Sequence, residues 1–92
     1  MNETQKRFFA HLASVQEESV RRCLAKHNIT DSTTEAVLYE VTSSAIADIL
    51  TMIDGYSTYS KDRHDLVNMV TGQKLKEDPS IELHDQIEEY LK

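Results

Sequence analysis

The sequence is short of the residues that mark disulfide frameworks and long irregular loops. Its 92 residues include a single cysteine, Cys23, one proline and two glycines. A lone cysteine excludes an internal disulfide, and the scarcity of proline and glycine disfavours long structureless segments. We therefore expect one folded domain over residues 1–92, with the cytoplasm as its location.

Membrane segments and basic stretches are also missing. No uninterrupted apolar run approaches the roughly 20 residues of a membrane helix, and the first residues, MNETQKRFF, have no apolar signal core. Residues 28–60 contain no lysine or arginine, and the chain has a net charge of −6. Without a long apolar run, we expect no membrane insertion. Because an acidic chain repels phosphates, we also expect no nucleic-acid binding. A basic protein partner is compatible with this charge.

Motifs of enzymes are equally scarce. The chain has no glycine-rich phosphate loop, no G-x-S-x-G and no C-x-x-C. A His-Asp pair occurs twice, in RHDL at residues 63–66 and in LHDQ at residues 83–86. The pairs resemble the signature of metal-dependent phosphohydrolases only in the dipeptide, and metal chemistry needs three or four converging ligands. We expect no catalytic residue, no metal and no cofactor.

What the sequence does contain is helical periodicity. Apolar side chains of residues 3–27 fall within one stripe of a helical wheel, and Asn28 follows as a left-handed stop. A second helix is predicted to begin at the capping box STTE, with Ser32 as its N-cap, and to end at Gly55. Its apolar arc is too wide for one neighbour, so it should be the central helix.

The C-terminal third is less regular. Residues 61–70 predict a short third helix that ends at Gly72, and the alternative is a small hairpin that pairs LVNMV with KL around TGQ. The last helix should start at DPS, with Asp78 as cap and Pro79 in the first position. The predicted fold class is all-α: a small bundle of three longer helices, with a short helix or hairpin between the second and the last.

One face of the second helix is the strongest candidate for a binding surface. It is acidic, hydroxylated and built mostly from short side chains, and no base on the same helix neutralises it. Tyr56 and Tyr59 follow the helix, and tyrosine is enriched at interfaces. Asp85 should point outward from the last helix. The expected partner-binding residues are Glu40, Ser44, Asp48, Thr51, Asp54, Tyr56, Tyr59 and Asp85.

Three segments together resemble a group of small bacterial proteins with an IDGY…TG…LHD pattern. They are LYEVTSSAIADILTMIDGYS, DLVNMVTGQKL and ELHDQIEEYL. Some proteins of this group accompany secreted or contact-delivered toxins, so the resemblance implies an immunity role. It also implies structural roles for Gly55, Gly72 and His84. Gly55 would turn the chain after the central helix, and His84 would return to hydrogen-bond the region of residues 54–72.

These patterns leave three functions open. The first is a non-enzymatic protein-binding module, most concretely an immunity protein that masks a bacterial toxin through acidic surfaces. The second is a structural or regulatory homodimer, because the apolar arc of the second helix is wider than a small monomer can cover. The third is a small metal-dependent hydrolase that uses the residues of the two His-Asp pairs.

Overall fold

The computed structural model describes residues 1–77 and 81–92, so the predicted cap at Asp78 and Pro79 lies outside the described residues. The described chain contains four helical elements: α1 Glu3–Lys26, α2 Ser32–Asp54, the 3-10 turn η1 Leu83–Gln86 and α3 Ile87–Tyr90. The predicted all-α fold class is confirmed. Two of the helices are long, and not three as predicted: the last is short, because Glu82 is still extended and helical turns begin only at Leu83.

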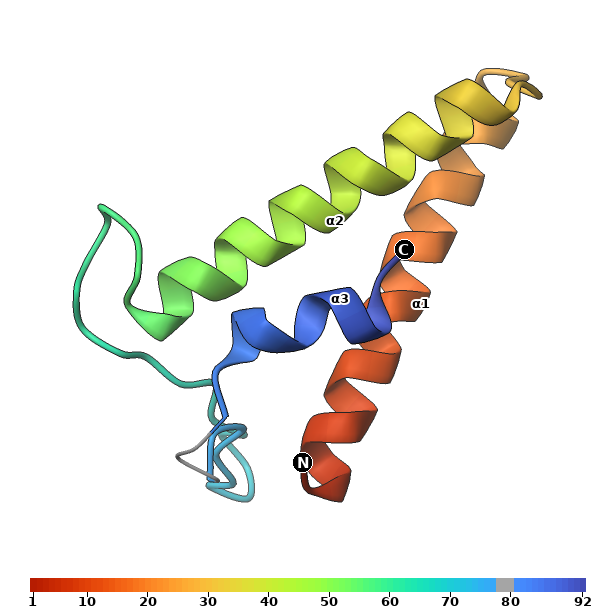
Figure 1. Ribbon diagram of the computed structural model, residues 1–92. Coiled ribbons are helices and arrows are strands. Elements are labelled where there is room, and N and C mark those ends of the chain that lie inside the picture. Colours follow the sequence, from red (N-terminus) through yellow and green to blue (C-terminus); the bar gives the residue numbers. More distant parts are fainter. Residues whose placement is uncertain (78–80) are drawn as a thin grey trace.

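The two long helices form a hairpin with open arms. α1 and α2 meet at the turn around residues 27–31 and diverge toward their other ends, and η1 and α3 lie between the arms (Figure 1). The C-terminal segment enters this space with its apolar side chains buried. The buried core cluster consists of Phe9, Leu50, Leu75, Leu83, Ile87 and Leu91. Burial of these side chains from three parts of the chain is the main force that holds the hairpin arms and the C-terminal segment together.

Side-chain caps fix where the long helices begin. At α1, Asn2 and Gln5 form a reciprocal capping box, with both hydrogen bonds 2.9 Å long. At α2 the N-cap is Asp31, whose carboxylate accepts from the Thr34 N–H at 2.8 Å. The prediction of Ser32 as N-cap is wrong by one residue, because an ionised carboxylate is a stronger acceptor than a hydroxyl.

The far ends of both helices follow their sequence signals. Asn28 has φ 54, the left-handed conformation expected of a residue that stops α1. Gly55 has φ 88 and forms the left-handed C-cap of α2. The chain therefore leaves both helices through residues that tolerate positive φ, one by its lack of a side chain and one by its short polar side chain.

Residues 61–77 form no helix, so the prediction of a third helix at 61–70 is wrong. Val67 and Lys74 instead pair in an antiparallel bridge, which is close to the hairpin alternative. The Asn68 side chain accepts from two following backbone N–H groups, at 2.9 and 3.1 Å, and Gly72 has φ 76. Asparagine in this position competes with helical hydrogen bonds, which explains why a tight turn replaces the helix.

α2 is apolar and largely open to solvent. By length and composition it is able to cross a membrane, since it contains an apolar window of 18 residues, although the sequence shows no uninterrupted apolar run. One such helix is weak evidence for a membrane span, since core helices of soluble proteins have the same composition. Only 6% of that window is buried, so α2 differs from an ordinary core helix.

Candidate functional site

α2 ends beside a group of ionisable side chains that we call the Asp54 cluster: Asp54, Lys76, Glu82 and His84. Asp54 is fully buried, and its Oδ1 lies 2.5 Å from Lys76 Nζ. Its Oδ2 accepts from the backbone N–H of His84 at 2.9 Å and lies 2.6 Å from the His84 ring Nδ1. Lys76 Nζ is also 3.9 Å from Glu82 Oε2. One carboxylate thus joins the end of α2 to two later segments of the chain.

The position of Asp54 corrects the predicted binding surface. Asp54 was expected on the outward acidic strip of α2, but Lys76 and the chain leading into η1 cover this end of the helix. Burial alone would raise the pKa of the Asp54 carboxyl; the Lys76 ammonium and the N–H groups of His84 outweigh burial and hold the pKa below its ordinary value. Asp54 is therefore an ionised structural group and not part of an exposed binding surface.

His84 returns from the C-terminal segment to the end of α2, in the region where hydrogen bonding was expected. The Tyr56 ring packs edge-on against the His84 ring, with 5.3 Å between centroids. His84 Nε2 lies 3.2 Å from the carboxylate of Asp85. The imidazole is therefore held by Asp54 on one side and Asp85 on the other, while Tyr56 covers part of its surface.

His64, the histidine of the other His-Asp pair, has a different environment. Its side chain is exposed, and its Nδ1 lies 3.2 Å from the backbone oxygen of Ile53. The Tyr59 ring is 6.2 Å away between centroids, and Tyr59 itself is 73% exposed. His64 therefore contributes a local contact beside the end of α2, and it does not belong to the group of residues around Asp54 that has metal-ligand spacing.

The Asp54 cluster has the residue types of a metal site but already contains a cation. Ligand atoms of Asp54, Glu82 and His84 lie within 4.8 Å of one another. The side chain of Lys76 is only 8% exposed, and its ammonium lies beside both carboxylates, where a metal ion would have to bind. Because Lys76 neutralises this negative charge, the described residues fit an ion-pair network better than a metal centre. Arg63 adds a further ion pair to Glu82.

The two glycines that were predicted to be structural, Gly55 and Gly72, differ in their surroundings. A Cβ on Gly55 would lie 2.7 Å from the backbone oxygen of Asp62, and φ 88 is itself unfavourable for other residues. Gly55 is therefore required both by its conformation and by the close approach of the following chain. Gly72 also has positive φ, but a Cβ there would meet nothing within 4 Å.

A groove between α2 and the C-terminal segment contains part of the predicted binding surface. We call it the α2–α3 groove. Short side chains of α2 form one side, and the acids Glu40 and Glu88 face it together with a single base, Lys92. Its lining residues are Ala36, Tyr39, Glu40, Ser43, Ser44, Ala47, His84, Ile87, Glu88 and Lys92.

The other predicted binding residues lie outside the lining of this groove. Asp48 is exposed on the next turn of α2, while the Thr51 hydroxyl donates to the backbone oxygen of Ala47 at 2.8 Å. Tyr56 is 59% exposed, and Asp85 is exposed and contacts His84, which itself lines the groove. Glu40 and Ser44 thus line one groove together with His84, the neighbour of Asp85. Tyr59 lies beside His64 instead.

Gln16 is a structural residue that is not among the predicted site residues. Its side chain is 2% exposed, and its Nε2 donates to the Tyr39 backbone oxygen and the Thr42 hydroxyl, both at 3.1 Å. Its Oε1 accepts from the backbone N–H of Lys92 at 3.0 Å. One amide thereby joins α1, α2 and the C-terminal segment at one end of the α2–α3 groove. The signal in the sequence is a glutamine inside the apolar stripe of the first helix.

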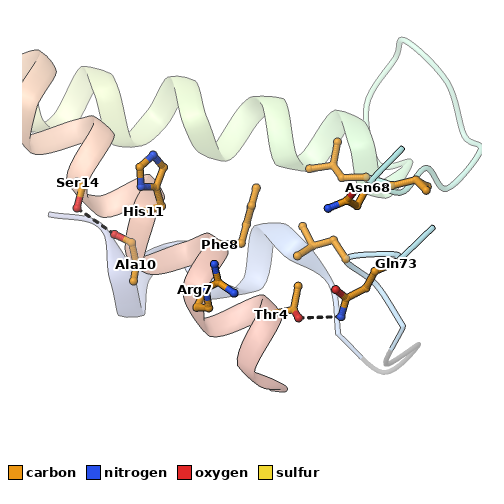
Figure 2. A pocket seen from close by; sticks show the side chains of 11 residues that line it. Thr4, Arg7, Phe8, Ala10, His11, Ser14, Asn68 and Gln73 are labelled. Carbon is orange, nitrogen blue, oxygen red and sulfur yellow. Dashed lines mark hydrogen bonds between the residues drawn. The ribbon is translucent and has the colours of Figure 1, made fainter. Parts of the chain in front are cut away.

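A larger hollow lies between the first turns of α1 and the turn around Asn68. Figure 2 shows Thr4, Phe8 and His11 on one side of it and Asn68 and Gln73 on the other. Gln73 Nε2 donates to the Thr4 hydroxyl at 2.8 Å, which links the turn to α1. No acidic residue lines this hollow, so it does not offer the charge that a basic partner would require.

Comparisons with family models, curated proteins and solved structures found no match for this chain. The function must therefore be inferred from the geometry and charge of its own surfaces.

Proposed function

We propose that this chain is a non-enzymatic protein-binding module, and that the α2–α3 groove holds a basic segment of its partner. The observation that carries the proposal is the combination of short side chains and acids along one groove. Ser43, Ser44 and Ala47 allow a partner chain to approach the α2 backbone closely, and Glu40 and Glu88 supply negative charge beside them.

Charge around the groove supports a partner that carries arginine or lysine. Asp85 is exposed beside His84, which lines the groove, and the base among the lining residues, Lys92, lies 5.2 Å from the centre of the Tyr39 ring. Opposite charges across such a groove raise the association rate and select the partner, more than they raise the final affinity. Binding should therefore weaken as the salt concentration rises, since salt screens these attractions.

The specific form of this proposal is an immunity protein that masks a bacterial toxin. Its support is the resemblance of the IDGY…TG…LHD segments to proteins that accompany toxins. A toxin gene beside the gene for this chain would supply the candidate partner. Co-expression should then protect cells from that toxin, and the same cells should die when the chain carries Glu40→Lys and Glu88→Lys together.

The direct test is a titration with short lysine- and arginine-rich peptides, followed by the amide NMR signals of the labelled chain. Signals of Ser43, Ser44 and Ala47 should shift, and the shifts should be lost with Glu40→Lys plus Glu88→Lys. The matched control is Glu3→Lys plus Glu18→Lys, which changes the net charge equally on the exposed surface of α1. Equal loss of binding in both double variants would show a non-specific charge effect and contradict the groove.

A further inference from the structure

The chain exposes more surface than a compact protein of its mass. Its accessible surface is 6450 Å² for 10.5 kDa, whereas a folded monomer of this mass exposes roughly 5400 Å². Its radius of gyration is 15.0 Å, against about 12 Å for a compact chain of the same length. The excess surface, about 1000 Å², has the size of one partner's share of a stable interface, which is about 800 Å².

Part of this surface is an apolar row along α2. Val37, Val41, Ala45 and Ile49 follow one another at four-residue spacing, and we call them the α2 ridge. The three larger side chains are 49%, 59% and 53% exposed, and Ala45 is exposed as well. Val41 lies half a turn from the buried Leu50 on the helical wheel, so the ridge faces away from the core.

From the excess surface and this row we propose that two copies of the chain pair through the α2 ridge, antiparallel and related by a two-fold axis near Ala45. Residues at four-residue spacing form a ridge that packs between the same ridges of a second helix. With the small Ala45 at the crossing point, the helices approach closely. Val41 of each copy then faces Ile49 of the other, as a two-fold interface requires.

This interface is distinct from the α2–α3 groove. Glu40 and Val41 are about 100° apart on the helical wheel, so the acidic side of the groove lies beside the ridge, and Ser44 lies at the border between the two surfaces. The proposal thus adds a self-association surface to the proposed partner site. Met69 and Val70 are also exposed, at 93% and 94%, but two residues at the tip of a turn offer less area than a helix face.

Charge gives the dimer a signature opposite to that of partner binding. Asp48 lies beside the ridge, and α2 contains no base, so pairing brings carboxylates of the two copies closer together. Added salt screens this repulsion and should strengthen dimerisation. Binding of a basic partner in the groove should weaken under the same conditions, so the two events are distinguishable.

Analytical ultracentrifugation of the full chain over a range of protein and salt concentrations tests the proposal. A dimer should form and tighten with salt, and Ala45→Arg should weaken it by roughly a hundredfold or more, since it places a charge at the apolar crossing point. Val41→Ile should leave it within about threefold of the unaltered chain. A monomer at every concentration, or a dimer that Ala45→Arg leaves unchanged, would overturn the proposal.

A cross-linking measurement distinguishes loss of the interface from loss of folding in the Ala45→Arg variant. In a Cys23→Ser background, Ala45→Cys should form an intermolecular disulfide under mild oxidation, because the two-fold axis places the two sulfur atoms together. Thr33→Cys, near the start of α2, is the control that should not cross-link in the same dimer. Equal cross-linking at both positions would contradict the antiparallel register. Co-sedimentation with phosphatidylcholine vesicles in place of dimer formation would instead assign α2 to a membrane and overturn the proposal.

Discussion

The two His-Asp segments, RHDL and LHDQ, share a dipeptide and differ in what surrounds it. His84 of LHDQ contacts a fully buried carboxylate, whereas His64 of RHDL is exposed and contacts a backbone oxygen. Both histidines lie beside the last turn of α2. The dipeptide by itself therefore assigns no role; the role of each histidine depends on whether it contacts a group that is buried in the core.

Removal of the buried carboxylate of Asp54 should have the largest effect on stability. Asp54→Ala leaves the buried Lys76 ammonium without its close partner, with only Glu82 at 3.9 Å, and should lower the free energy of unfolding by about 3–5 kcal/mol. Urea denaturation followed by circular dichroism measures the loss. Adding Lys76→Met to Asp54→Ala should recover part of the stability, because the unpaired charge is then gone. A double variant less stable than Asp54→Ala would contradict this account of the cluster.

The next effect tests the glycine that joins α2 to the RHDL segment. Gly55→Ala combines positive φ with a contact to the Asp62 carbonyl, and should cost more than the roughly 1–2 kcal/mol of a left-handed alanine alone. Gly72→Ala shares the positive φ but has open space, so its cost should stay within that range. The comparison is made by thermal or urea unfolding of the two single variants. Equal losses would show that the approach of Asp62 contributes nothing.

Replacing each histidine in turn tests whether the two segments differ in their contribution to stability. His84→Ala removes a hydrogen bond to an ionised carboxylate and should lower the free energy of unfolding by about 1.5–3 kcal/mol. His64→Ala removes an exposed side chain and should change it by no more than about 0.5 kcal/mol. Both values come from the same urea titration. Equal effects would remove the distinction between the two segments.

The smallest effect is a pH dependence. The pKa of Asp54 is lower in the folded chain than in the unfolded chain, so its contribution to stability is fully present above the unfolded pKa, about 3.9. It is lost as the pH falls from there through the folded pKa. The unaltered chain should therefore lose stability in this acid range more steeply than Asp54→Asn does. Parallel slopes of the two chains below about pH 4 would contradict the lowered pKa.

The sequence was sufficient for features that depend on neighbouring residues. The apolar stripe of α1, the left-handed stop at Asn28 and the glycine cap at Gly55 are local, and each lies where the pattern predicts it. The prediction of a third helix was wrong for an equally local reason: Asn68 and Gly72 favour a turn over the helix that the apolar residues suggest. The alternative prediction of a hairpin is closer to the antiparallel bridge between Val67 and Lys74.

The sequence was insufficient where distant segments meet. The wheel placed Asp54 on the outward strip with Glu40 and Asp48, but it could not show that Lys76 and His84 fold over one end of that strip. Nothing in the local sequence pattern around Lys76 or Glu82 predicts a buried ion pair. The groove itself is formed by α2 and by a segment some forty residues later in the chain, which periodicity alone does not bring together.

The position of the core residues along the chain has a consequence for synthesis. Leu83, Ile87 and Leu91 supply half of the buried core cluster, and Gln16 bonds to Lys92 across 76 positions of sequence. Because domains emerge from the ribosome N-terminal part first, the α1–α2 hairpin is made well before the residues that pack between its arms. During that interval the apolar residues of α2 that the C-terminal segment covers, such as Leu50, are exposed. A chain truncated before residue 83 should therefore bind hydrophobic chaperones more strongly than the chain of residues 1–92.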